Sequence, residues 1–167
     1  MTSHLDRLQK ELESALAGAG AESLVHSPEG KWSIAQILEH LLLSYRGTAK
    51  GLSKCLEAGK PLATRATAMQ RAATLLVLDL GYFPTGRKAP ERTVPRGMPA
   101  AEVREAIFPE IRTMATQLDE CERRFGADTR VLDHPVIGPL TVPQWRKFHW
   151  IHGRHHAKQI RARMGKA

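Results

Sequence analysis

Aromatic residues and cysteines are scarce in this sequence, and it contains no long apolar run. Phe, Trp and Tyr together make up 5% of the 167 residues, and there are two cysteines. The two, Cys55 and Cys121, lie far apart and form no C-x-x-C pair, so they are typical of free thiols in a reducing cytosol. No segment approaches the roughly 18 consecutive apolar residues of a transmembrane helix, so we expect no membrane partner.

Signatures of several common enzyme classes are also missing. There is no glycine-rich phosphate loop, no G-x-S-x-G and no H-E-x-x-H, which argues against nucleotide-binding, serine-hydrolase and zincin chemistry. The N-terminal segment MTSHLDRLQKELESAL is amphipathic and charged, and it lacks the apolar core of a secretory signal. We therefore expect a cytoplasmic protein.

The residues that are abundant favour helices. Apolar residues make up 42% and charged residues 25% of the chain, which are globular values. Ala, Leu, Glu, Arg, Lys and Gln are common, and all of them form helices readily. The sequence thus predicts an all-α protein, and a chain of this length is most simply one domain spanning residues 1–167.

Positive charge is the unusual bulk property. Lys and Arg number 25 against 17 Asp and Glu, for a net charge of +8. Such an excess can attract nucleic acid, a membrane surface or an acidic substrate. The cations are dispersed, however, and no segment forms the basic run of roughly five to eight residues that indicates nucleic-acid binding. We interpret the excess as a solvated basic surface, with nucleic-acid binding as the alternative.

Apolar residues recur with helical spacing in five segments. This pattern predicts helices over residues 3–17, 33–58, 64–80, 99–125 and 141–163. Capping side chains mark three of the starts: Ser3, then Ser33 with Gln36, and Thr141 with Gln144.

Three further expectations concern residues 81–99, the predicted helix 64–80 and His134. Residues 81–99 contain four prolines and predict a long loop. Its cations, which include Arg87, Lys88 and Arg96, could steer an anionic ligand, or the loop could be a solvated insertion. The helix 64–80 has few charges and a nearly continuous apolar face, so we expect it to be deeply buried. His134, which precedes a proline, is expected in an extended loop.

The last predicted helix is rich in histidine. Four of the eight histidines lie in it, at positions 149, 152, 155 and 156. At about 100° per residue, His149, His152 and His156 share one stripe, and Lys and Arg occupy the opposite face. The imidazoles therefore point toward whatever the helix packs against. His152 and His156, four residues apart, could bind one metal ion, although hydrogen-bonded core histidines give the same pattern.

The predicted helix 33–58 carries one more histidine, His40. It lies at the flank of the apolar stripe, in line with Ser44 and two glycines, and such small residues leave space for close packing or a cavity. Glu39 falls on the face that we expect to be exposed to solvent. A lone histidine is more typical of a helix interface than of a metal site, so His40 matters chiefly as a partner for the C-terminal pair.

Two segments resemble the DinB/YfiT-like superfamily of metalloenzymes. One is WSIAQILEH at the start of the second helix, and the other is WIHGRHHAKQI in the last helix. The longer segment HPVIGPLTVPQWRKFHWIHGRHHAKQI resembles an uncharacterised branch of that superfamily, and the likeness covers nearly the whole chain. The resemblance implies an up-down-down-up four-helix bundle with long connecting loops. Because members are often dimeric, it also implies a homodimer.

The resemblance further implies a divalent metal, with zinc or nickel expected, held by His40, His152 and His156. Gln159 also matches the family pattern, and Gln159, Ser44 or Glu39 could orient a ligand ring through its second nitrogen. His149 departs from the pattern, and it could be a rival ligand or a group that supports the ligands.

Family members with known activity are thiol-dependent transferases or isomerases. For this chain, the resemblance implies a metal-dependent thiol S-transferase or hydrolase. Its metal would activate water or a low-molecular-weight thiol toward a small electrophilic substrate. The alternatives are a non-catalytic basic helical module that binds a small ligand or nucleic acid, and a helical bundle whose histidines hold no metal.

Overall fold

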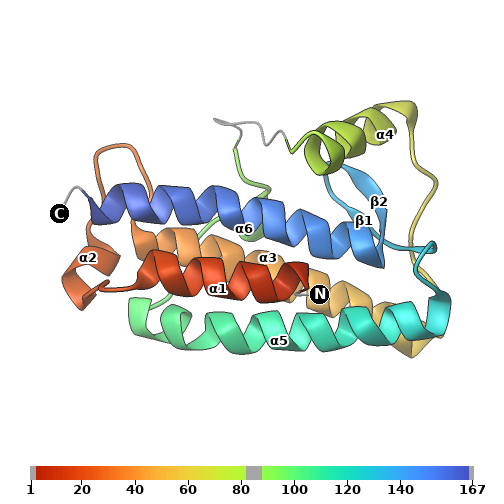
Figure 1. The fold of residues 1–167 in the computed structure, drawn as a ribbon, viewed down its shortest axis with the longest axis horizontal. Helices are drawn as coiled ribbons and strands as arrows, with labels where there is room; N and C mark the ends of the chain where they lie inside the picture. Colours follow the sequence, from red (N-terminus) through yellow and green to blue (C-terminus); the bar gives the residue numbers. More distant parts are fainter. Residues whose placement is uncertain (1–2, 82–87, 166–167) are drawn as a thin grey trace.

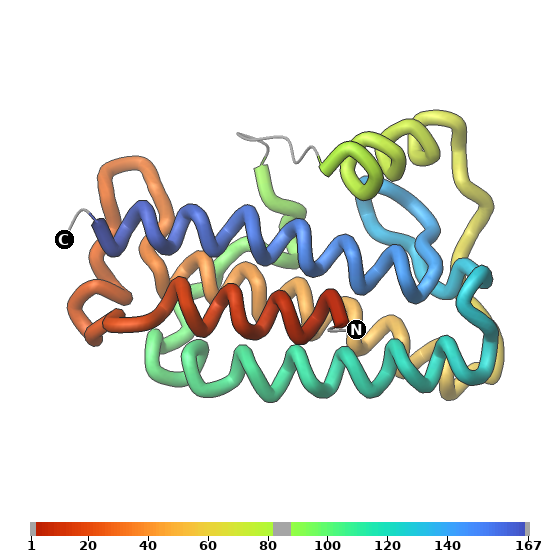
Figure 2. Tube along the Cα trace, in the orientation of Figure 1, coloured from red at the N-terminus to blue at the C-terminus, as the bar shows by residue number. Residues whose placement is uncertain are grey.

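The structure, a computed structural model, describes residues 3–81 and 88–165. The chain is mostly helical, and its long helices lie side by side (Figure 1). These helices are α1 (His4–Leu16), α3 (Ile34–Ala58), α5 (Ala100–Phe125) and α6 (Val142–Met164). Helices α1 and α6 run in one direction, and α3 and α5 run in the opposite one (Figure 2). No helix within the described residues combines the length and apolar character that a membrane crossing needs.

Capping boxes begin α1, α3 and α6 at the predicted positions. In each box, the side chain before the helix accepts the backbone N–H of the third helical residue, whose own side chain accepts the N–H of the capping residue. The pairs are Ser3 with Asp6, Ser33 with Gln36, and Thr141 with Gln144. Helix α3 ends at Gly59, whose left-handed φ of 63° favours glycine. These boxes fix where each helix begins and so which side chains face inward.

Aliphatic side chains from the four long helices fill the core. Helix α3 packs mainly against α5, and α1 packs mainly against α6. The largest fully buried side chains include Leu8, Leu12, Ile37, Tyr45, Ile107 and Met114. Helices α3 and α6 face each other with fewer close backbone contacts, so larger side chains can occupy the space between them. The histidines lie in that space.

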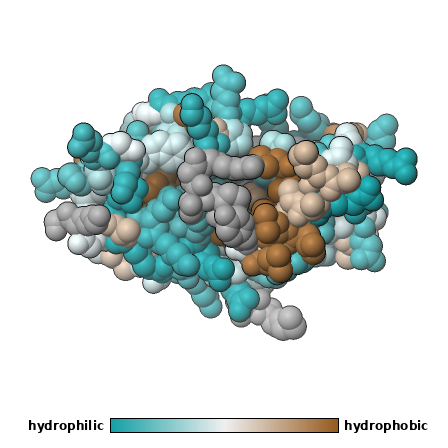
Figure 3. Space-filling model, turned by 90° about the horizontal axis from the view of Figure 1, so that it is seen from above, coloured by the Kyte–Doolittle hydropathy of each residue, from teal (hydrophilic) through white to brown (hydrophobic). Residues whose placement is uncertain are grey.

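The expected deep burial of residues 64–80 is wrong for most of the segment, in which Val77 and Leu78 are buried. The segment forms a short helix, α4 (Ala68–Thr74), and a π-helical turn, η1 (Leu75–Asp79), and no residue of α4 is buried. Met69, Leu75 and Leu80 are 82%, 56% and 70% exposed. Seen from above, an apolar area lies over this part of the molecule (Figure 3). The face of α4 is apolar, but the helix lies outside the long helices, where nothing within the described residues covers Met69.

The all-α expectation also needs correction in the connector before α6. Strands β1 (Arg130–His134) and β2 (Gly138–Thr141) form a small antiparallel sheet in which Leu132 pairs with Leu140. His134 therefore ends a strand and does not lie in a loop, and its Nδ1 accepts the N–H groups of Val136 and Ile137. A further short helix, α2 (Ala21–Val25), forms in the segment after α1 that no pattern had marked.

The predicted loop 81–99 is described from residue 88 onward, and Arg87 lies outside the described residues. It contains a 3₁₀ turn, η2 (Glu91–Thr93), which packs against α3. We call residues 91–98 the strap. The strap places backbone groups directly beside the first half of α3, where His40 lies.

Candidate metal centre

Three imidazole rings converge between α3 and α6. The Nε2 atom of His152 lies 3.1 Å from that of His40 and 3.1 Å from that of His156. One ligand atom from each ring lies within 4.8 Å of the others, and all three residues are buried. His152 and His156 are one turn apart on the inward face of α6, so their side chains are neighbours. Helix α3 brings His40 to the same point from the opposite side.

Hydrogen bonds behind two of the rings set their tautomers. The Nδ1 atom of His40 lies 2.8 Å from the carbonyl oxygen of Thr93 in the strap. The Nδ1 atom of His156 lies 2.8 Å from the side-chain oxygen of Gln159. Since a carbonyl oxygen can only accept, each Nδ1 carries the proton and donates it. Each Nε2 therefore keeps a lone pair that faces the centre of the cluster, as a metal ligand requires.

Burial keeps these rings neutral. Desolvation, helped by the nearby His40, lowers the pKa of His156 to about 3. Burial also lowers the pKa of His152 well below its ordinary value, and the neighbouring imidazoles act in the same direction. Desolvation lowers the pKa of His40, while its hydrogen bond to Thr93 acts against that shift. Protons compete with metal ions for imidazole nitrogens, so a lowered pKa favours metal binding near neutral pH.

The two separations from the Nε2 atom of His152 fit a tetrahedral ion. Two nitrogens at roughly 2.0–2.1 Å from a tetrahedral zinc ion lie about 3.3 Å apart, close to the 3.1 Å separations seen here. Among the described residues, no Cys, Asp or Glu joins the three histidines in this group. Three neutral protein ligands with one position left open are typical of catalytic zinc sites, whereas structural sites are closed by four.

Two aromatic side chains lie against this cluster. The ring of Trp32 lies 5.3 Å from that of His40, and Phe148 stacks on His152 with ring centroids 5.4 Å apart. Apolar rings beside a metal site limit the access of water and lower the local dielectric constant. Charges at the centre are therefore screened less than they would be on the surface.

The other predicted site residues have different surroundings. Gln159 accepts the Nδ1–H of His156, as described above. The hydroxyl of Ser44 donates to the main-chain carbonyl of His40 and not to its ring. His149 is buried one turn before His152, and its Nε2 lies 3.1 Å from the hydroxyl of Thr48. His149 is not part of the converging group, and burial lowers its pKa to about 3.

Glu39 is the residue that the sequence interpretation misplaced. The helical pattern predicts it on the solvent face of α3, but it is 1% exposed. The strap covers it, and its carboxylate accepts the backbone N–H groups of Arg96, Gly97 and Met98. A helical wheel could not have revealed this, because the residues that bury Glu39 come from a distant loop. The role of Thr93 was missed for the same reason, since a backbone carbonyl leaves no signature in sequence.

One known family matches nearly the whole chain. Residues 3–163 match the family described as Protein of unknown function (DUF1569). The chain belongs to the DUF1569 family. No curated protein and no solved structure gives a significant match. The matched span of this DUF1569 protein includes the three converging histidines, Gln159 and the strap.

Proposed function

We propose that this DUF1569 protein is a divalent-metal-dependent enzyme of the DinB/YfiT type, built as a single helical domain. His40, His152 and His156 would be the metal ligands. The convergence of their three Nε2 atoms, with neutral rings and inward lone pairs, is the observation that carries the proposal. The opposed directions of α1 and α6 against α3 and α5 support the up-down-down-up bundle of that superfamily.

The chemistry follows from the ligand set. Bound to three neutral imidazoles, a zinc or nickel ion keeps its full divalent charge and an open position, which would lower the pKa of a water or thiol placed there. Thr93 and Gln159 would hold two of the rings in their productive orientation. Trp32 and Phe148 would restrict water. We propose that the reaction is either the transfer of a low-molecular-weight thiol to a small electrophile or the hydrolysis of that electrophile.

Metal analysis of protein purified without a histidine tag tests the site. We expect about one zinc or nickel ion per chain, because three convergent ligands typically bind a single ion. The variants His152→Ala and His156→Ala should lose it. His26→Ala, which removes an exposed histidine outside the cluster, is the matched control and should keep it. Unchanged metal content in the first two variants would reject the ligand assignment.

The resemblance to the DinB/YfiT type also bears on the oligomeric state. We propose that the protein is a homodimer in solution. Light scattering coupled to size-exclusion chromatography measures this directly, and a monomer across the accessible concentration range would reject it.

A further inference from the structure

We propose that Glu39 is a positioning residue for the metal ligand His40. Its carboxylate fixes the strap, and the strap in turn supplies the Thr93 carbonyl that orients the His40 ring. This inference rests on the proposed metal site, but its structural part concerns residues that are present whether or not a metal is bound.

The contacts of Glu39 make it an anchor. Oε1 accepts the N–H of Arg96 at 2.7 Å, and Oε2 accepts those of Gly97 and Met98 at 3.1 Å each. Hydrogen bonds to an ionised carboxylate are roughly twice as strong as neutral ones. A carboxylate that is 1% exposed would be strongly disfavoured without such partners. Glu39 and these three amides therefore hold one another in place.

The backbone conformation at Gly97 makes this anchor possible. Its φ of 87° lies in the left-handed region, which residues other than glycine rarely adopt. That turn lets three successive N–H groups face one carboxylate, an arrangement that forms an anion-binding concavity. The Gly97 position is open, since a Cβ there would meet no atom within 4 Å. A side chain at 97 would thus disturb the turn without disturbing the core.

The strap is held at a second point, one residue further along α3. His40 follows Glu39 directly, and its Nδ1 donates to the Thr93 carbonyl at 2.8 Å. Thr93 ends the 3₁₀ turn η2, where its N–H and its hydroxyl both bond to the carbonyl of Pro90. The Thr93 carbonyl therefore lies between two fixed points, the turn on one side and the Glu39 anchor on the other.

Loss of the Glu39 hydrogen bonds should affect His40, because the Thr93 carbonyl would then be free to move. A glutamine at position 39 would turn an NH₂ group toward backbone donors, so the strap would lose part of its attachment. If the Thr93 carbonyl shifts, His40 loses the acceptor that keeps its proton on Nδ1. The ring can then rotate, or carry the proton on Nε2, and in either case it no longer presents a lone pair to the metal. Loss of such an outer partner typically weakens metal binding by about 10–100-fold.

Two variants with matched controls test the proposal in the full-length protein. Glu39→Gln removes the anchor, and Gly97→Ala disturbs the same turn from an exposed position. Glu57→Gln makes the same change at an exposed site on α3, and Gly59→Ala introduces alanine at another left-handed glycine, where φ is 63°. Zinc affinity is measured by competition with a chromophoric chelator. The absorption spectrum of the cobalt-substituted protein reports the ligand geometry, and hydrogen exchange of metal-free protein reports the strap.

We expect Glu39→Gln and Gly97→Ala to weaken zinc binding by about 10-fold or more. We also expect them to alter the cobalt spectrum and to speed hydrogen exchange at residues 93–98. Both controls should match the wild type. If Glu39→Gln fails to fold, Gly97→Ala still decides the question. Zinc affinity within twofold of wild type in a folded variant whose strap exchanges faster would overturn the proposal.

If the proposed metal site does not exist, the same experiment gives a different result. In that case the wild type would bind no stoichiometric zinc, while strap exchange would still respond to Glu39→Gln. Unchanged strap exchange in Glu39→Gln and Gly97→Ala would also overturn the proposal, since the anchor would then be absent.

Discussion

The Nε2 atoms of His40 and His152 lie 3.1 Å apart, although 112 residues separate the two histidines in the sequence. Two neutral imidazoles at this distance can share at most one hydrogen bond. His156 approaches the same Nε2 of His152 at 3.1 Å, and the Nε2 atoms of His40 and His156 are both acceptors because their protons lie on Nδ1. One proton on His152 could satisfy only one of them. A cation at the centre would satisfy all three lone pairs together.

The buried histidines predict a strong dependence of stability on pH in the metal-free protein. Burial lowers the pKa of His149 and His156 to about 3 and that of His134 to about 4, from an ordinary 6.5. The unfolded chain therefore binds more protons below pH 6.5. The stability that these neutral histidines contribute is fully present above pH 6.5 and is lost as the pH falls toward 3.

We expect the free energy of unfolding to fall by up to about 1.4 kcal/mol per pH unit for each of these histidines. Urea unfolding of metal-free protein at a series of pH values between about 7.5 and 4.5 measures the slope. A free energy of unfolding that stays constant over this range would contradict the burial of neutral imidazoles. Added zinc should raise the stability at pH 7.5 and lose this effect at the acid end, because protons displace it.

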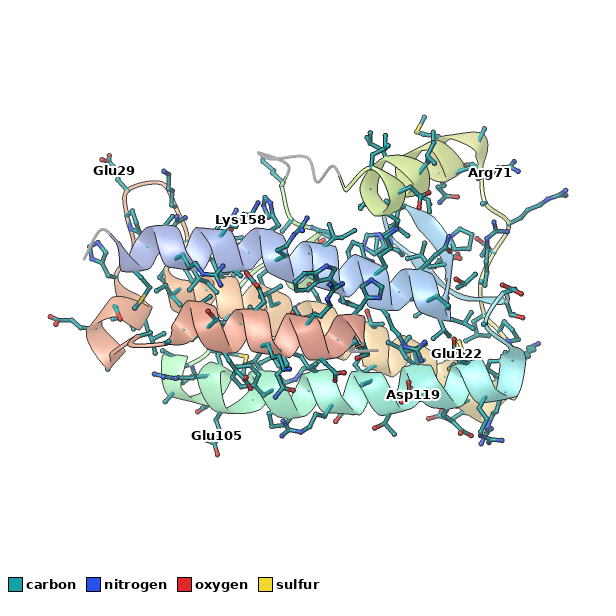
Figure 4. The ribbon with its side chains drawn as sticks, in the orientation of Figure 1. Glu29, Arg71, Glu105, Asp119, Glu122 and Lys158 are labelled. Atoms are coloured by element: carbon teal, nitrogen blue, oxygen red, sulfur yellow. The ribbon has the colours of Figure 1, made fainter. Side chains whose placement is uncertain are left out.

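Gln159 offers a test of ring orientation on α6. Its side-chain oxygen accepts from His156 Nδ1 at 2.8 Å, so Gln159→Ala should weaken zinc binding by roughly 10-fold. Gln159→Glu keeps an acceptor at the same place and should retain the affinity. The exposed neighbour Lys158 points away from the helices (Figure 4), and Lys158→Ala is the matched control. Equal affinities for Gln159→Ala and Lys158→Ala would show that the contact has no influence on the metal.

The local parts of this architecture could be predicted because they depend on short-range rules. Capping boxes at Ser33 and Thr141 fixed the starts of α3 and α6, and a four-residue spacing placed His152 and His156 on one inward face. Spacing alone could not bring His40 to them, since that meeting depends on how α3 and α6 pack. The family resemblance supplied that link.

The errors share a different physical cause. Glu39 was assigned to solvent because a helical wheel describes one helix, while the amides that bury the carboxylate lie 57 to 59 residues later. The segment 64–80 was expected inside because its face is apolar, yet α4 lies where neighbouring helices do not reach it. The β1–β2 hairpin was missed because its strands are short. Each outcome was decided by tertiary packing, which local patterns do not encode.

The distribution of charge predicts weak binding to nucleic acid. The Lys and Arg residues are dispersed along the sequence, and some of them pair with carboxylates. Arg146 bonds to Asp119 and Glu122 on α5, both labelled in Figure 4, and Arg161 bonds to Glu11. We expect no retention on single- or double-stranded DNA at physiological salt. Fluorescence anisotropy across a salt series measures this, and binding with a steep dependence on salt would instead favour the basic binding module.

Two glycines on the facing helices should respond in opposite ways to alanine. Gly153 of α6 is buried, and a Cβ there would overlap Cδ1 of the fully buried Leu8 and lie 3.5 Å from the Tyr45 hydroxyl. Gly153→Ala should therefore destabilise the protein by about 1–3 kcal/mol, the usual result of overpacking a core. Gly47 of α3 is exposed, and a Cβ there would meet nothing within 4 Å.

Gly47→Ala should stabilise the protein by roughly 0.5–1 kcal/mol, because alanine loses less backbone entropy in a helix. Chemical unfolding of the two variants beside the wild type gives both values. If Gly153→Ala proved as stable as Gly47→Ala, α1 and α6 could not approach each other as closely as the structure has them. The position of the α6 histidines relative to α3 would then need to be revised, since the same packing sets both.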